Sequence, residues 1–325
     1  MRRIITFLMG LLALPLMVEA QYTLQVSGTV RDAQTRAPMP HVNVVAKGTN
    51  IATVTNDDGV FLLKLPEGNT RITFSHMGYE SQSVFVRDGQ AKPLDIRLKP
   101  TVIQLDEVIV WTEDPRELVK IAVSKISDNY SERPERYQTF YREMVQKRKR
   151  YISVAEGVVD MYKSAYGRNV YRDGVSIRKG RRIISSRQRD TLGVKVLGGP
   201  AFPVKLDVVK NLDFLLSPEE LEGYKLTMGI PASVDGRIQY VVEIAPYALR
   251  DYPLFYGKLY IDRQTLAFTQ VELSLDMSDR LKATNFMLKK KPSGLRFKPK
   301  ELSCYIHYLT GNDGITRMSY IRNTF

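Results

Sequence analysis

Alternating apolar and polar residues dominate the first third of the chain and predict short β-strands. Runs rich in Val, Ile, Thr and Phe recur at close, even spacing, and turn residues separate them. Because side chains on a strand point to alternate faces, every second residue of a run shares one face. The rows expected to face inward are Val26, Gly28 and Val30; Val42, Val44 and Ala46; Phe61, Leu63 and Leu65; Ile72 and Phe74; Val84 and Val86; and Leu94, Ile96 and Leu98. This pattern predicts a small β-sandwich over residues 22–100.

The turn residues between these runs agree with this interpretation. Since proline lacks an N–H, strand pairing is expected to resume only after Pro40. In the sequence Asn56-Asp57-Asp58-Gly59, an Asx side chain can bond the nearby backbone, and the glycine can take a positive φ. We therefore expect a tight turn at this point.

The order of glycines, prolines and apolar positions in this stretch resembles the carboxypeptidase regulatory-like domain of Bacteroidota cell-envelope proteins. The matching residues are Gly28, Val30, Asp32, Pro40, Val42, Val44, Gly48, Thr49, Thr55, Asp58, Gly59, Phe61, Leu65, Gly78 and Tyr79. Asn56 stands where the family's T-D-x-x-G-x-F turn usually has Asp, and Asn forms the same turn. The resemblance implies a transthyretin-like or immunoglobulin-like sandwich in an envelope protein.

Peptidase chemistry is not predicted, despite the family name. A zinc carboxypeptidase needs a His-x-x-Glu pair and a further histidine. The three histidines are His41, His76 and His307, and none has Glu three residues later. The sequence therefore predicts no catalytic residue, no metal site and no cofactor, and it leaves the binding residues unidentified.

The N-terminus predicts export. Residues 1–20 combine Arg2 and Arg3, an apolar stretch too short to span a membrane comfortably, and small residues around Ala20, as a signal peptide does. We therefore expect a periplasmic location, with association to the outer membrane as a narrower possibility. The single cysteine, Cys304, lies in an alternating run, so we interpret it as a buried apolar side chain.

The chain is strongly basic, with a formal net charge of +13. Its basic clusters are Lys147–Arg150, Arg178–Arg182 and Lys289–Lys291. Because export makes nucleic acid an improbable partner, the expected partners are an envelope protein, anionic lipid headgroups or lipopolysaccharide phosphates. The alternative is that these clusters are solvated hairpin ends.

Residues 101–113 are predicted to link two domains. Within them, Leu105–Val110 resembles the segment that follows the same module in TonB-dependent receptors. This resemblance implies an energy-coupling contact, and the alternative is a plain linker or edge strand. The remaining chain is too short for the strand series of such a receptor.

The second domain, residues 114–325, is predicted to open with a helix over residues 112–130. Asp114 suits the N-cap, and Leu118, Ile121, Ala122 and Ile126 form an apolar stripe. A helix over residues 207–215 and a helix start at Ser217 are also expected. The predicted strands are residues 137–147, 151–163, 169–185, 225–229, 239–245, 257–262, 267–276, 281–290, 295–309 and 316–325.

This order predicts a mainly β chain whose second domain is an α+β unit with a curled antiparallel sheet and a leading helix. The hairpin from Tyr256 to Leu275 resembles periplasmic lipoprotein carriers, which implies a sheet that holds a lipid or another apolar ligand. The many aromatic residues equally suit an ordinary β core. The run that ends at Phe325 has no terminal turn, which is compatible with a longer chain.

Three functions follow as hypotheses. The favoured one is a non-enzymatic binding or assembly protein of the envelope. The alternatives are an accessory to TonB-dependent uptake and an envelope hydrolase whose site forms from residues distant in the sequence.

Overall fold

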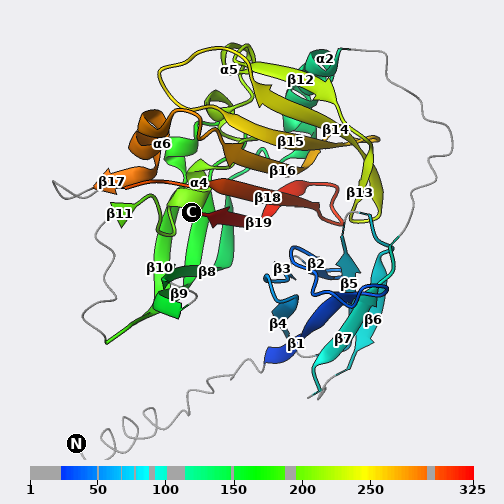
Figure 1. Ribbon diagram of the computed structural model, residues 1–325. Coiled ribbons are helices and arrows are strands. Elements are labelled where there is room, and N and C mark those ends of the chain that lie inside the picture. Colours follow the sequence, from blue (N-terminus) through cyan, green and yellow to red (C-terminus); the bar gives the residue numbers. More distant parts are fainter. Residues whose placement is uncertain are drawn as a thin grey trace, which may run out of the picture.

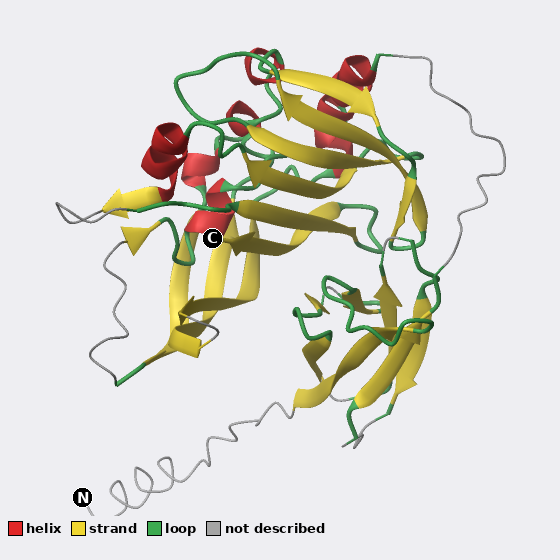
Figure 2. Cartoon of the chain, in the orientation of Figure 1, coloured by secondary structure: helices red, strands yellow, loops and turns green. Residues whose placement is uncertain are grey.

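The computed structural model describes residues 23–49, 51–66, 68–76, 78–87, 92–100, 114–147, 150–186, 195–290 and 297–325. Strands dominate these residues and helices are few and short, as predicted (Figure 2). The predicted signal peptide, the linker and the Leu105–Val110 segment lie outside the described residues. Within them, no helix has the length and apolar character needed to cross a bilayer.

Residues 23–100 form a β-sandwich of two sheets, shown in blue and cyan in Figure 1. One sheet has the order β4-β1-β7 and the other the order β3-β2-β5-β6. The strands are β1 (Thr23–Asp32), β2 (Asn43–Ala46), β3 (Ala52–Val54), β4 (Val60–Pro66), β5 (Thr70–Ser75), β6 (Gln82–Val86) and β7 (Leu94–Leu98). All pairs are antiparallel except β1 with β7.

The core of the sandwich matches the alternation seen in the sequence. Its buried residues include Val26, Val30, Val42, Val44, Ala46, Phe61, Leu63, Leu65, Ile72, Phe74, Val86, Ile96 and Leu98. The predicted turn is also present, because the Asn56 side chain accepts hydrogen bonds from the backbone N–H groups of Asp58 and Val60. Gly59 has a φ of 72°, and a Cβ there would meet the Val30 carbonyl at 2.4 Å.

Residues 114–325 form the second body, and its largest sheet has seven antiparallel strands. They are β12 (Tyr224–Met228), β13 (Ala232–Val234), β14 (Arg237–Pro246), β15 (Phe255–Asp262), β16 (Phe268–Leu275), β18 (Ser303–Thr310) and β19 (Thr316–Thr324). The order is β12-β14-β15-β16-β18-β19, and β13 pairs with β14. The predicted turn after β15 is fixed by Asp262, whose carboxylate accepts from the N–H groups of Gln264 and Thr265.

A second sheet of three long strands extends from this body at the lower left of Figure 1. Its strands are β8 (Glu135–Lys147), β9 (Arg150–Lys163) and β10 (Gly174–Ile184), in the order β10-β9-β8. Arg317, on β19, pairs with Glu135 at 2.8 Å and joins the two sheets. A small two-stranded sheet joins β11 (Lys195–Val196) to β17 (Leu288–Lys290).

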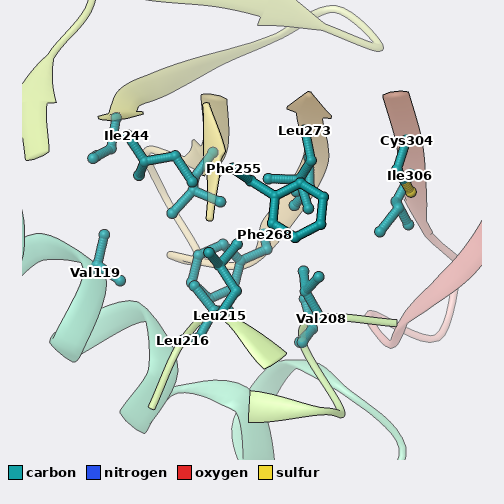
Figure 3. Packing of buried hydrophobic residues seen from close by; sticks show 14 of the residues in the cluster. Val119, Val208, Leu215, Leu216, Ile244, Phe255, Phe268, Leu273, Cys304 and Ile306 are labelled. Carbon is teal, nitrogen blue, oxygen red and sulfur yellow. The ribbon is translucent and has the colours of Figure 1, made fainter. Parts of the chain in front are cut away.

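The helices are short: α2 (Pro115–Ser124), α3 (Ile126–Asn129), η2 (Val170–Arg172), α4 (Phe202–Lys205), η3 (Leu212–Phe214), α5 (Pro218–Leu221) and α6 (Arg280–Met287). Of these, α2, α3, α5 and α6 contribute buried side chains to the core on the inner face of the seven-stranded sheet. Figure 3 shows Phe255, Phe268 and Leu273 on the strands facing Val119 and Leu215 across the core. The inner face that a carrier would use for an apolar ligand is therefore packed with the chain's own side chains.

Several expectations for local structure differ from the structure. The helix expected over residues 207–215 is only the turn η3, and the strand expected over residues 169–185 begins at Gly174, after η2. The predicted leading helix is present with Asp114 as its N-cap, and Leu118, Ala122 and Ile126 are buried as expected. It breaks at Lys125, Val119 joins the buried stripe, and Ile121 is exposed. The predicted strand over 281–290 is mostly helix α6, because the Asp279 side chain caps it by accepting from the N–H groups of Leu281 and Lys282. The predicted strand over 295–309 begins only at Ser303, after a coil that contains Pro299.

Candidate functional site

A cavity of about 520 Å³ lies where the sandwich meets the outer face of the seven-stranded sheet. The sandwich supplies His41, Asn43, Asp57, Ser75 and His76. The sheet and its loops supply mainly polar residues: Ser233, Asp235, Gln270, Glu272, Ser274, Glu301, Ser303, Tyr305, Arg322 and Thr324. Both bodies are therefore needed to form the cavity.

The floor of the cavity belongs to a polar row that crosses the sheet from edge to edge. The strand register aligns Thr227, Glu243, Lys258, Glu272, Tyr305 and Arg322 across six strands. Directly paired residues point to the same face of a sheet, so these side chains share the outer face. A second hollow, of about 510 Å³, runs along this row and shares Glu272 and Ser274 with the first.

Asp235 joins the sandwich to the sheet. It lies at the tip of the β13–β14 hairpin, where Asp235 and Gly236 have φ values of 50° and 78°. Two positive φ values describe the hairpin turn that favours Asp-Gly. The Asp235 carboxylate accepts from Ser75 Oγ at 2.8 Å and from Asn43 Nδ2 at 3.4 Å, and it pairs with His307 Nε2 at 2.8 Å.

The charge of Asp235 is stabilised by these neighbours. Desolvation between the two bodies would by itself raise the pKa of this carboxyl. The His307 ring and the donors Ser75 and Asn43 outweigh that effect, so the pKa of Asp235 lies below its ordinary value. The hairpin tip thus places an ionised acceptor at the contact between the bodies.

Arg322 and His41 form the second contact between the bodies. Arg322, on β19, lies 3.0 Å from an Asp57 carboxylate oxygen, and its guanidinium is 3.4 Å from His41 Nδ1. The His41 ring also stacks on Tyr305 at 5.8 Å. Burial and the Arg322 charge lower the pKa of His41, against the opposing effect of Asp57.

His41 has an unusual backbone as well. Its φ is 61°, in the left-handed region that residues other than glycine seldom adopt. Such conformations are kept where the surrounding structure holds them, and they gather at functional sites. This outlier lies at the cavity wall, which marks the contact as a candidate site.

Ser75, Asp235 and His307 have the residue types of a hydrolytic triad but a different order of hydrogen bonds. In a triad the histidine accepts the proton of the serine, and the carboxylate orients the histidine from the other side. Here the carboxylate lies between the two, because Ser75 donates to Asp235 rather than to His307. This arrangement does not activate Ser75 as a nucleophile.

Cys304 is also not an activated nucleophile. Cys304 borders the cavity together with Ser303 and Tyr305. Strand alternation directs its thiol to the inner core, near Ile306 and Leu273 (Figure 3). Burial raises the pKa of Cys304 to about 12. A thiol with such a pKa stays protonated at neutral pH, so the interpretation as a buried apolar side chain agrees with the structure.

The cavity lining carries several hydrogen-bond acceptors, of which Glu272 and Glu301 already accept from Gln270 and Ser303. The Asn43 Oδ1 atom is buried and has no hydrogen-bond partner. Carboxylates of Asp57, Glu272 and Glu301 line the same space, and Arg322 is already paired with Asp57. A buried acceptor without a partner is costly, so this lining favours a ligand that donates hydrogen bonds.

A different polar cluster lies inside the second body. The Asp207 carboxylate is fully buried, pairs with Lys163, and accepts from Tyr166 at 3.0 Å and from Tyr308 at 2.8 Å. Lys210 pairs with a second buried carboxylate, Asp173, at 2.6 Å. Because Lys163 ends β9 and Tyr308 lies on β18, this cluster joins the two sheets and is structural.

The histidines singled out in the sequence lie in one region of the structure. His41, His76, Asp57 and the Asp235 partner His307 gather at or beside the cavity. The described residues contain no group of three or more His, Cys, Asp or Glu side chains able to hold a metal ion.

Asp235, Glu272 and Arg322 were missed by the sequence reasoning. The Asp-Gly dipeptide between two alternating runs was a visible hairpin signal. Nothing in the sequence indicated that this hairpin meets the sandwich.

Residues 26–110 match the family model of the CarboxypepD_reg-like domain, so the N-terminal part of the chain carries the domain that its sequence resembles. The chain is 38% identical over 86 residues to the TonB-dependent receptor P39 of Formosa agariphila and 39% identical over 85 residues to the TonB-dependent receptor SusC of Bacteroides thetaiotaomicron. Each match covers 26% of this chain and 8% of the receptor. These matches associate the N-terminal domain with envelope receptors, and the matched domain is regulatory-like rather than catalytic.

Among solved structures, the chain is similar to MucB in the MucA/MucB complex of Pseudomonas aeruginosa. The sequence identity is 16%, the TM-score is 0.22, and the match covers 62% of this chain and 77% of that chain. The crystal structure of MucB alone gives 15% identity and a TM-score of 0.22, with 63% of this chain and 92% of that chain covered.

Proposed function

We propose that this chain is an exported, non-enzymatic binding protein of the cell envelope, and that its ligand lies in the cavity between the sandwich and the seven-stranded sheet. The observation that carries the proposal is a cavity of about 520 Å³ with a largely polar lining built jointly by two bodies. Sites between domains are frequent places for ligands. The signal-like N-terminus and the receptor matches support the envelope location.

The proposed ligand is polar and rich in hydrogen-bond donors. Asn43 Oδ1 and the carboxylates of Glu272 and Glu301 would accept from it, and the Tyr305 ring would give it one flat apolar contact. Hydroxyl groups of a saccharide and ammonium groups of an amine share this chemistry. The packed inner face of the sheet makes the apolar-ligand alternative less favourable than this one.

The test begins with the full mature chain purified from an envelope extract and measured by native mass spectrometry. A co-purifying polar species would support the proposal and identify its class. Titration with maltohexaose and, separately, with spermidine then distinguishes hydroxyl donors from ammonium donors. A clean protein mass together with no binding of either probe would overturn the proposal.

Variants locate the bound species. Glu272→Gln and Asn43→Ala alter the cavity, and we expect each to weaken binding about tenfold, since a lost hydrogen bond to a charged or buried group is worth roughly 1–3 kcal/mol. Glu219→Gln, an exposed residue on α5, is the matched control and leaves affinity unchanged. Equal affinities for all three variants would place the ligand elsewhere.

A second candidate function is an accessory role in TonB-dependent uptake. It is favoured by the matches to TonB-dependent receptors and by the resemblance of Leu105–Val110 to the segment that follows this module in them. Deletion of Leu105–Val110 should then abolish co-purification with a receptor and leave cavity binding intact. Unchanged co-purification would reject this role.

A further inference from the structure

The three-stranded sheet carries an exposed face on which arginines and acidic residues form a ladder. Glu156 lies between Arg142 and Arg181, at 2.7 and 2.6 Å. Four residues further along β9, Asp160 lies between Arg136 and Arg178, at 2.8 and 2.9 Å. Each rung spans all three strands. We call this surface the arginine face.

The carboxylates lie close to the sheet, and the arginine side chains lie over them, toward the solvent. The Glu156 side chain is 11% exposed, whereas those of Arg142 and Arg181 are 46% and 71% exposed. The arginines that flank them lower the pKa values of both Glu156 and Asp160, so these carboxylates stay ionised. What a partner meets on this face is therefore an array of guanidinium groups, with four arginines against two carboxylates.

Large apolar side chains lie on the same face, Phe140 between the two rungs and Met144 and Ile183 in the row beyond the Glu156 rung. Phe140 pairs in register with Val158, and Met144 pairs with Val154, which in turn pairs with Ile183. Phe140, Met144 and Ile183 are 61%, 50% and 57% exposed. Arg142 also lies 5.3 Å from the Phe140 ring centroid, so cationic and apolar groups alternate along β8.

This combination is unusual for a solvated sheet face. A solvent-facing row of an antiparallel sheet is ordinarily polar, and exposed clusters of large apolar residues mark interaction sites. The two hollows described above lie on the other sheet, so this face is a separate surface. The net positive array favours an anionic occupant.

We propose that the arginine face binds the surface of an anionic phospholipid membrane. Guanidinium groups would contact lipid phosphates, while Phe140, Met144 and Ile183 would enter the boundary between headgroups and acyl chains. Basic residues with apolar residues between them are what interfacial binding needs, because each adds to the affinity in a different way. The apolar stems of arginine can lie at that boundary while the charged ends reach the phosphates. This surface is separate from the cavity, so either proposal can fail without the other.

The test is co-sedimentation of the full mature chain with vesicles of phosphatidylcholine, with and without phosphatidylglycerol. We expect binding only to vesicles that contain phosphatidylglycerol, and loss of most of it near 1 M salt, where the screening length falls to about 3 Å. Each basic residue near a membrane contributes about 1 kcal/mol, a factor of about five. Arg142→Gln with Arg181→Gln should therefore weaken binding about 25-fold.

A matched control removes the same charge elsewhere. Arg97→Gln with Lys120→Gln alters two exposed basic residues outside the face and should change binding by less than about threefold. Phe140→Ser with Met144→Ser should weaken binding to anionic vesicles at unchanged net charge. Circular dichroism and thermal unfolding check that each variant is folded.

Removing a negative charge from the arginine face gives the sharpest test of membrane binding. Glu156→Gln raises the net charge of the face by one and should tighten membrane binding about fivefold. No binding to anionic vesicles would overturn the proposal, and it would direct attention to an acidic protein partner instead. Equal losses in the control and the arginine variant would also overturn it, because they would reflect net charge alone.

Discussion

Two carboxylates, Asp207 and Asp235, each have three side-chain partners, and their surroundings differ. Asp207 lies inside the second body and is bound by Lys163 and two tyrosines. Asp235 lies between the two bodies, and its side chain is 23% exposed. The first group joins parts of one core, and the second holds one body against another.

The comparison shows how burial decides what a polar cluster can do. A fully buried ion pair cannot open without leaving a charge in a medium that solvates it poorly, so it acts as a fixed joint. In a partly exposed cluster, water can replace a lost partner, so opening the cluster costs less free energy. Asp235 therefore suits a contact that adjusts to a ligand, and Asp207 does not.

The largest effect is expected at Asp207. Asp207→Asn would leave Lys163 buried without its counter-charge and lower the free energy of unfolding by about 3–5 kcal/mol. Urea titration of the mature chain measures this loss. Asp95→Asn breaks an exposed pair with Arg97 and should change stability by less than about 1 kcal/mol. Similar losses of stability in both variants would contradict the proposed difference between the buried ion pair and the exposed one.

A smaller and more local effect is expected at Asp235. Asp235→Ala removes the acceptor of Ser75 and His307, which weakens the contact by about 1–3 kcal/mol. Hydrogen exchange should accelerate at the ends of β2 and β5, while the inner strands β15 and β16 keep their protection. Acceleration throughout the large sheet would mean that Asp235 stabilises the whole fold.

Chemical labelling of Cys304 should distinguish the loss of Asp207 from the loss of Asp235. The thiol lies in the core of the second body, and its pKa of about 12 slows alkylation further. Iodoacetamide should therefore label the native protein slowly, Asp207→Asn markedly faster, and Asp235→Ala at the native rate. Faster labelling of Asp235→Ala would show that the cavity contact also protects this core.

The contact between the bodies should weaken in acid. The folded-state pKa of His41 is below its unfolded value of about 6.5, so its contribution is fully present above about pH 6.5 and is lost as pH falls through the lower value. The pKa of Asp235 is lowered too, so its contribution is present above about pH 3.9 and is lost only as pH falls further.

Hydrogen exchange of β2 and β5 as a function of pH measures these two steps. His41→Asn keeps a residue that tolerates positive φ and should remove the step that begins near pH 6.5. Asp235→Ala should remove the step at lower pH. A His41→Asn variant with an unchanged profile would exclude this ring as the titrating group.

The sandwich could be predicted from local sequence patterns, because turn chemistry and strict alternation act at short range. Val42, Phe61 and Ile72 point inward because side chains alternate between the two faces of a strand, and this alternation is visible in the sequence. The fold class and most strands of the second body followed in the same way. Helix α6 did not, because the Asp279 cap outweighed an ambiguous apolar pattern.

The candidate site, in contrast, depends on long-range packing. Asn43, Asp235 and His307 are far apart in the chain, and the one local signal among them, the Asp235-Gly236 turn, says nothing about the other two. The register of six strands placed Glu272 beside Tyr305 and Arg322, and the packing of one body on the other closed the cavity over them. The strand register and the contact between the bodies depend on the whole chain, whereas the turns and alternating rows depend on a few neighbouring residues.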